Sequence, residues 1–218
     1  MKTYPIMLKL AGRRAVVVGG GQVGLRRARR LAEAGAEVTL VAEEVTADAQ
    51  PAGLTVLRQP YRRELLTGAF LVLACTDDRA VNSRIAADAR AAGALVNVAD
   101  QPGDCDFFLP ATLRDGDVVV AVGTGGLAPA LAMELRDRLA AAMPKRSGEF
   151  AEALAGLRSS AHARLHDPKL RAEIMRELSG PSAHEAFLAG GHRALREKME
   201  RMIERRAHSG NDLGDPDL

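Results

Sequence analysis

Short apolar runs alternate with helical patterns along the first half of the chain. Residues 14–19 form an apolar run that ends in glycines, which is typical of a buried strand leading into a tight turn. Apolar residues then recur at helical spacing over residues 22–34, and Gly35 ends that helix. A β-branched run follows at residues 37–42. This order of strand, glycine turn, helix and strand predicts a βαβ unit with a parallel sheet.

The alternation continues for another 60 residues or so. We predict three further strands and one further helix, at residues 54–57, 69–75 and 95–98 for the strands and residues 78–92 for the helix. Residues 1–112 are therefore expected to form an α/β domain, a Rossmann-like doubly wound parallel sheet.

The pattern changes after residue 112. A strand is predicted at residues 117–122 and an amphipathic helix at residues 129–143, so residues 113–145 form a segment of their own. Beyond it only helical patterns occur, at residues 149–166, 169–178 and 182–206, which predicts a small all-helical domain over residues 146–208. Residues 209–218 are polar and acidic, and we expect a disordered tail there.

Composition narrows the class of protein. Of the 218 residues, 47% are hydrophobic but only 3% are aromatic, so the core must be aliphatic. The net charge of +2 argues against a nucleic-acid partner, since nucleic-acid binders carry a concentrated basic excess. No stretch reaches the length of a membrane span, and two cysteines make no disulfide scaffold. We expect a cytoplasmic protein with no membrane partner.

Three glycines form a dinucleotide-binding fingerprint. Gly19, Gly21 and Gly24 stand in G-x-G-x-x-G order after a predicted strand and at the start of a predicted helix, the context that makes this motif specific. Gly19 permits the tight turn, Gly21 lets the backbone approach a pyrophosphate, and Gly24 lets the helix pack close to the sheet. The amides near Gln22 and Val23 would face the phosphates. The alternative is a glycine turn that binds no ligand.

Two glutamates follow the second strand. A carboxylate about 20 residues past the glycines typically accepts hydrogen bonds from a ribose hydroxyl, and Glu43 and Glu44 stand slightly farther along. Glu43 would repel a 2′-phosphate, so the cofactor is expected to be NAD rather than NADP. A solvated pair of glutamates is the alternative.

Five segments in chain order resemble one protein family. They are Pro5-Ile6 with Leu8 and Leu10, the glycine-rich run of residues 16–42, ACTDDRAVN at residues 74–82, NVADQPGDCDFFLPA at residues 97–111, and VAVGTGGLAPALA at residues 120–132. Together they cover residues 5 to about 145. In these segments the sequence resembles the precorrin-2 dehydrogenase domain, which occurs alone or as the N-terminal half of siroheme synthases.

The resemblance implies an activity and a homodimer. A member of this family would use NAD to oxidise precorrin-2 to sirohydrochlorin, on the way to siroheme or cobalamin, and would dimerise through residues 113–145. In the stand-alone form that we expect, methylation of the precursor falls to another protein. Two alternatives stay open. A bifunctional member would also insert iron or cobalt as a chelatase, and a non-catalytic module would only sense NAD.

Several polar residues are candidates for the chemistry. Asp100 follows the fifth predicted strand, at the sheet edge where ligands of α/β folds bind, and matches the family's proposed catalytic aspartate. Thr76 and Asp77 follow the fourth strand, where the nicotinamide ribose is expected. The resemblance places Thr124, with Gly125 and Gly126, at the tetrapyrrole pocket. A turn or capping role is the alternative for each polar residue.

Other residues suggest a metal site or an anion site less directly. Cys105 stands between two aspartates, but a stable metal site usually needs three or four suitably spaced ligands, so we expect none there. His162 and His166 are four apart and are interpreted as surface residues rather than ligands. Four arginines at residues 26–30 form either a solvated helix face or a surface that attracts the polycarboxylate substrate.

Overall fold

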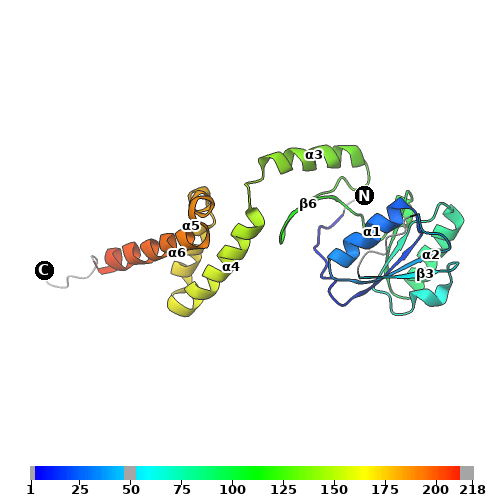
Figure 1. Ribbon diagram of the computed structural model, residues 1–218, viewed down its shortest axis with the longest axis horizontal. Coiled ribbons are helices and arrows are strands. Elements are labelled where there is room, and N and C mark those ends of the chain that lie inside the picture. Colours follow the sequence, from blue (N-terminus) through cyan, green and yellow to red (C-terminus); the bar gives the residue numbers. More distant parts are fainter. Residues whose placement is uncertain (1–2, 47–52, 212–218) are drawn as a thin grey trace. The chain divides into compact units, whose positions relative to one another are not determined.

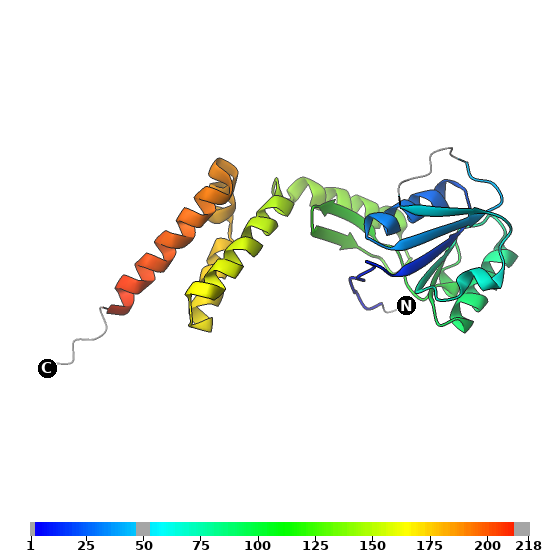
Figure 2. The same cartoon turned by 60° about the horizontal axis from the view of Figure 1, so that its bottom comes forward.

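The computed structural model describes residues 3–46 and 53–211. Contacts divide the chain into two compact units, drawn in Figures 1 and 2. The first unit is Met1–Pro110 together with Gly123–Pro129, and the second is Ala111–Val122 together with Ala130–Leu218. The glycine-rich bend before the third helix therefore groups with the first unit.

The first unit is built on a five-stranded parallel sheet. Its elements in chain order are β1 (Arg14–Val18), α1 (Gln22–Glu33), β2 (Glu37–Ala42), β3 (Leu54–Arg58), the short 3₁₀ helix η1 (Arg63–Leu66), β4 (Leu71–Ala74), α2 (Arg79–Ala91), β5 (Leu95–Val98) and η2 (Pro102–Asp104). The strand order is β3-β2-β1-β4-β5, and every pair is parallel. This is the Rossmann order, with its reversal between β1 and β4, and it confirms the predicted α/β class.

Alternate side chains of the strands feed two separate cores, one on each face of the sheet. On one face, Val17 and Leu73 pack with Leu25 and Leu31 of α1. On the other face, strand residues such as Val16 and Val72 pack with Ile85 of α2 and Leu66 of η1. Because both faces are covered, the central strands are apolar throughout, as the sequence pattern predicts. Figure 2 shows α1 and α2 on the two sides of the sheet.

The second unit begins with a β-hairpin. Strands β6 (Ala111–Asp115) and β7 (Val118–Val122) pair antiparallel, with Asp115 opposite Val118. Gly116 takes the first place of the two-residue turn with φ +56°, a conformation that favours glycine. Strand β7 was predicted from the sequence, whereas β6 was not.

Four helices follow the hairpin in the described part of the chain. They are α3 (Pro129–Ala142), α4 (Ser147–Arg164), α5 (Pro168–Leu178) and α6 (Pro181–Asn211). Predicted helices correspond to all four, with one correction: α6 is interrupted at Gly191, whose φ of 62° and ψ of −149° are not helical. The expected tail starts within the last turn of α6, and its residues 212–218 lie outside the described residues.

Helices α4, α5 and α6 share a core, whereas α3 has almost none. Phe187, Ile174 and Leu157 are among the buried residues of the shared core. In α3 only Ala132 is buried. Among the described residues, no helix is both long enough and apolar enough to cross a membrane.

Candidate active site

The glycine turn after β1 is packed too closely for most side chains. A Cβ on Gly19 would lie 2.3 Å from the carbonyl oxygen of Cys75, and φ at Gly19 is +121°. A Cβ on Gly20 would lie 2.0 Å from the carbonyl oxygen of Glu44, and one on Gly24 would lie 2.0 Å from that of Gly19. These three glycines are therefore required by the protein's own packing.

Gly21 differs from its neighbours because it faces open space. A Cβ there would meet nothing within 4 Å. Gly21 is also the N-cap of α1, and it makes no side-chain cap hydrogen bond. The first helical bond of α1 joins the amide of Leu25 to the carbonyl of Gly21 at 3.0 Å, so the amides of Gln22 and Val23 precede the helical ladder. An uncapped helix start beside open space fits the pyrophosphate of a dinucleotide.

The two predicted glutamates lie at the end of β2, beside this turn. Glu43 and Glu44 are exposed. Thr46 holds their loop in place, because its amide and its Oγ1 both donate to the carbonyl of Gly20, at 3.1 and 3.2 Å. Thr46 was not predicted from the sequence, since a hydroxyl that ties two loops together leaves no spacing pattern.

Thr76 lies at the end of β4 and is held by a buried amide. Asn82 of α2, only 2% exposed, accepts from the Thr76 amide at 3.1 Å and donates to the Thr76 carbonyl at 2.8 Å. The Thr76 hydroxyl is near two acceptors, the Asn82 Oδ1 at 2.8 Å and the Asp78 carbonyl at 3.1 Å. Its hydrogen is thus committed within the protein, so the hydroxyl could meet a further group only as an acceptor. Asp77 is exposed beside it.

Asp100 is exposed and adopts the left-handed conformation, with φ +58°. Asp is one of the few residues that tolerates this region, and strain of this kind clusters at functional sites. The amide of Ala99 donates to the carbonyl of Ala74 at 2.9 Å. Asp100 and Cys75 are the residues that follow this bonded pair, so they leave the neighbouring strands β5 and β4 at the same edge of the sheet. Burial raises the pKa of the Cys75 thiol, the Arg27 guanidinium lowers it, and the Asp100 carboxylate raises it.

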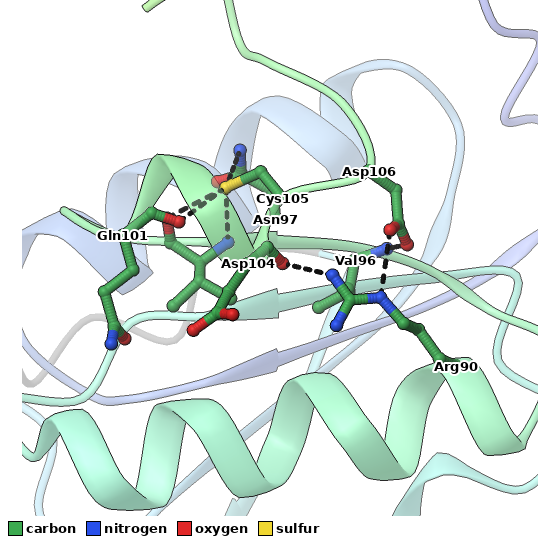
Figure 3. A network of polar contacts seen from close by, with 8 residues as sticks. Arg90, Val96, Asn97, Gln101, Asp104, Cys105 and Asp106 are labelled. Carbon is green, nitrogen blue, oxygen red and sulfur yellow. Dashed lines mark hydrogen bonds and ion pairs between the residues drawn. The ribbon is translucent and has the colours of Figure 1, made fainter.

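Hydrogen bonds hold the Asp104–Asp106 segment against β5 and α2 (Figure 3). The Cys105 sulfur accepts from the Val98 amide at 3.2 Å. Asp106 accepts from the Val96 amide at 3.0 Å and from Arg90 Nε at 3.1 Å. The contacts with Val96 and Val98 hold this segment along β5, so that edge of the sheet is covered, and the contact with Arg90 ties the segment to α2.

Near this network, two buried amide oxygens have no hydrogen-bond partner among the described residues, Asn97 Oδ1 and Gln101 Oε1. Asn97 uses its Nδ2 to donate to the Phe107 carbonyl at 2.8 Å. Gln101 reaches Ser83 Oγ through its Nε2 at 3.4 Å. Asn97 of β5 therefore holds the backbone at Phe107 against the sheet.

The glycine-rich bend carries the residues expected at the tetrapyrrole pocket. Thr124 Oγ1 accepts from the Ala128 amide at 3.2 Å, so this hydroxyl supports the start of α3. Gly125 and Gly126 have φ values of 63° and 81°. A Cβ on Gly126 would lie 3.3 Å from the ring of Phe108, which places the bend against the first unit. No hydrogen bond among the described residues joins Thr124 to Asp100.

Two surface hollows lie away from these residues. One of about 370 Å³ is lined by Arg63, Glu64, Thr67, Gly68 and Ala92. The other, of about 470 Å³, lies where β1, β2 and β3 begin, so it opens at the opposite end of the sheet from the glycine turn. Ligands of this fold bind at the carboxyl end, and neither hollow contains a predicted site residue.

The histidine pair does not share one helix face. His162 belongs to α4, whereas His166 lies beyond the end of that helix at Arg164. Within residues 3–46 and 53–211, no group of three or more His, Cys, Asp and Glu side chains is arranged to hold a metal ion.

The sheet order and the glycine turn define a dinucleotide-binding domain of the Rossmann type. Residues 6–111 match a domain family described as "Putative NAD(P)-binding". The siroheme synthase of Methylococcus capsulatus is 39% identical over 205 residues, which are 92% of this chain and 43% of that protein. The siroheme synthase of Pseudomonas entomophila is 38% identical over 231 residues, covering 100% of this chain and 50% of that protein. The chain thus spans about half the length of these curated relatives.

A solved structure matches most of the chain. The protein titled "SirC, precorrin-2 dehydrogenase" matches with a TM-score of 0.73 and 25% identity, over 91% of this chain and 100% of that one. The chain belongs to the family formed by precorrin-2 dehydrogenase and the N-terminal region of siroheme synthases.

Proposed function

We propose that this protein oxidises precorrin-2 to sirohydrochlorin with NAD⁺ as the oxidant. The observation that carries the proposal is the shared edge: the open position at Gly21 and the exposed carboxylate of Asp100 both lie at the carboxyl end of one parallel sheet, on a chain of this family. A dinucleotide at the glycine turn and a macrocycle beside Asp100 would then meet at that edge.

The residues divide the work between cofactor and substrate. The amides of Gln22 and Val23 would hold the pyrophosphate, and the lone pairs of Thr76 would accept from the ribose or the carboxamide of the cofactor. Bound NAD⁺ supplies the hydride acceptor. A hydride and a proton leave the macrocycle, and Asp100 would take the proton. Thr124 and the adjoining glycines would line the side of the macrocycle.

Cofactor choice would depend on Glu43. This exposed carboxylate at the end of β2 would accept hydrogen bonds from the adenosine ribose and repel a 2′-phosphate. We expect kcat/KM to be far higher with NAD⁺ than with NADP⁺, and Glu43→Gln to narrow that ratio by about tenfold. Glu37, exposed at the opposite end of β2, provides the matched control Glu37→Gln, which should leave the ratio unchanged. Equal use of both cofactors by the wild-type chain would remove this role of Glu43.

We also propose that the chain forms a homodimer through residues 113–145. The supporting observation is the apolar face of α3, where Leu131, Leu135 and Leu139 are 51%, 38% and 46% exposed. Contiguous apolar surface of this kind is unfavourable in water and usually marks a protein–protein interface. Residues 1–112 and 146–208 would then be the nucleotide-binding and helical domains on either side.

Anaerobic turnover tests the activity. The purified chain is incubated with precorrin-2 and NAD⁺, and the absorbance of sirohydrochlorin is followed with and without ferrous or cobaltous ion. We expect oxidation that needs NAD⁺ and no metal. Metal insertion in the same assay would add the chelatase activity of the bifunctional alternative. A chain that binds NAD⁺ and leaves precorrin-2 unchanged would be a sensing module instead.

A further inference from the structure

Arg27 is set apart from the other arginines of α1. Arg26, Arg29 and Arg30 are exposed, whereas Arg27 is half-buried. Its Nη1 donates to the Cys75 sulfur at 3.3 Å, on the first residue after β4. Side chains on a helix lean toward its N-terminus, so Arg27 reaches back from the second turn toward the carboxyl edge of the sheet.

This guanidinium has no carboxylate partner within residues 3–46 and 53–211. A neutral thiol is a weak acceptor, and it uses one of the five N–H donors of arginine. Burial raises the pKa of the Cys75 thiol, which keeps the thiol neutral. Removing part of a guanidinium from water costs free energy unless an anion compensates it. Arg27 is half-buried and has no carboxylate partner among the described residues, so it still has N–H donors for an anion.

Asp100, the proposed proton acceptor, lies near the Cys75 residue that Arg27 contacts. Asp100 follows Ala99, Cys75 follows Ala74, and those two alanines are hydrogen-bonded at 2.9 Å. Arg27 and Asp100 therefore flank the same short stretch of backbone. The pyrophosphate of a dinucleotide would occupy the open side at Gly21 instead, where the uncapped amides are.

We propose that Arg27 binds a carboxylate of the tetrapyrrole substrate and thereby sets the macrocycle beside Asp100. The inference rests on the proposed function. A polycarboxylate must approach an edge that carries Asp100, Asp77, Glu43 and Glu44, all exposed acids. A guanidinium on that edge offsets the repulsion, and its planar fork matches a carboxylate.

Matched variants test this role. Arg27→Gln removes the charge from the site, and Arg29→Gln removes the same charge from the exposed face of the same helix. At saturating NAD⁺ we expect Arg27→Gln to raise the KM for precorrin-2 by about 10- to 100-fold, the loss expected for charge-assisted hydrogen bonds, with kcat changed far less. Arg29→Gln should resemble the wild type. Arg27→Lys, which keeps the charge but loses the fork, should fall between them.

A binding measurement separates this proposal from the activity. Uroporphyrin, a stable tetrapyrrole with carboxylate side chains, is titrated into each variant, and its octamethyl ester serves as the uncharged comparison. We expect Arg27→Gln to weaken binding of the acid and leave that of the ester unchanged. Calorimetry with NAD⁺ shows that the variant is folded and should give the wild-type affinity.

Each outcome decides between the claims. Wild-type binding of uroporphyrin by Arg27→Gln would overturn the assignment of Arg27, whether or not the chain oxidises precorrin-2. Loss of NAD⁺ affinity in Arg27→Gln would assign this arginine to the cofactor pyrophosphate and would also overturn it. Lack of turnover by a wild-type chain that binds uroporphyrin through Arg27 would contradict only the proposed reaction.

Discussion

Within the glycine turn, similar residues have different physical roles. Gly19, Gly20 and Gly24 are enclosed by backbone atoms of the protein, and a methyl group at any of them would collide with a carbonyl oxygen. Gly21 alone faces outward. This turn thus contains three glycines that the packing of the protein requires and one, Gly21, that it does not, so substitution can separate folding from a role in ligand binding.

Substitutions at Gly21 and Gly19 should have opposite effects. Gly21→Leu places a side chain in open space, so we expect an unchanged melting temperature and a loss of NAD⁺ binding of at least tenfold in calorimetry. Gly19→Ala should instead destabilise the fold by about 3 kcal/mol, because it adds both a steric overlap and a strained φ. Full NAD⁺ affinity in Gly21→Leu would show that no cofactor lies against this position.

Asp100 offers the sharpest test of the chemistry. Asp100→Ala removes an exposed acceptor and no apolar surface, so the fold should survive. We expect kcat to fall by roughly 10²–10⁴-fold, the usual contribution of a positioned base, while NAD⁺ affinity changes little. Any chelatase activity should fall with it.

The control for Asp100→Ala is Asp100→Gly. Glycine suits the left-handed backbone better than alanine, so the two variants separate strain from chemistry. Both should show the same loss of kcat if the carboxylate takes the proton. A folded variant of either kind that oxidises precorrin-2 at the wild-type rate would leave Asp100 as a turn residue.

For single residues, the sequence predicted their place in the fold better than their side-chain contacts. Spacing after strands identified Thr76, Asp100 and the glycines, and the structure puts them at one end of the sheet, because parallel strands share a carboxyl edge. The bonds from Thr46 to Gly20 and from Arg27 to Cys75 were not predictable. Each joins elements far apart in the chain through side chains that follow no periodic pattern.

Among the elements, α2 supports the site most directly. Asp78 caps this helix by accepting from the amides of Ala80 and Val81, at 2.7 and 3.1 Å. The next turn supplies Asn82, which satisfies both backbone groups of Thr76. The helix therefore holds in place the backbone at Thr76, which follows β4 and lies beside the glycine turn.

Asn82→Leu tests this support. The leucine keeps the volume but leaves the Thr76 amide and carbonyl without partners, which should cost about 1–3 kcal/mol for each buried group in denaturant unfolding. NAD⁺ binding should weaken as well, since Thr76 loses its fixed position. Ser83→Ala alters the next, exposed residue and should change neither quantity. An Asn82→Leu variant as stable as the wild type would mean that Thr76 is held by other contacts.

Two elements show why boundaries and bends escaped prediction. Strand β6 is short, and its five residues include Thr, Arg and Asp, so it lacks the apolar signal of the buried strands. The interruption of α6 at Gly191 lies inside a sequence that is helical on both sides, and a single glycine inside such a pattern is often tolerated without a bend. The apolar, β-branched runs of β1 and β2 were predicted well because burial on both faces of the sheet requires apolar residues at successive positions.

For the whole molecule, the leucines of α3 make the oligomeric state testable. Leu131, Leu135 and Leu139 are four apart and lie on one face of the helix. We expect light scattering at micromolar concentration to give a dimer for the wild type and a monomer for the double variant Leu131→Glu and Leu135→Glu. Arg138→Ala removes only an exposed ion pair with Glu134 and should leave the dimer intact. A wild-type monomer would contradict the proposed assembly.

The hairpin of the second unit is joined to α4 by a contact between two glycines. The Asp115 carboxylate accepts from the Gly148 amide at 3.1 Å, and a Cβ on Gly148 would lie 2.4 Å from the Asp115 carbonyl oxygen. A Cβ on Gly116 would lie 3.2 Å from the Cα of Gly148. In a saturation mutational scan, positions 116 and 148 should therefore tolerate as few amino acids as the nucleotide turn does. Low tolerance at these two positions would reflect the close packing of the hairpin against α4. A scan that takes intolerance to substitution as a sign of catalysis would therefore wrongly assign an active site to this contact.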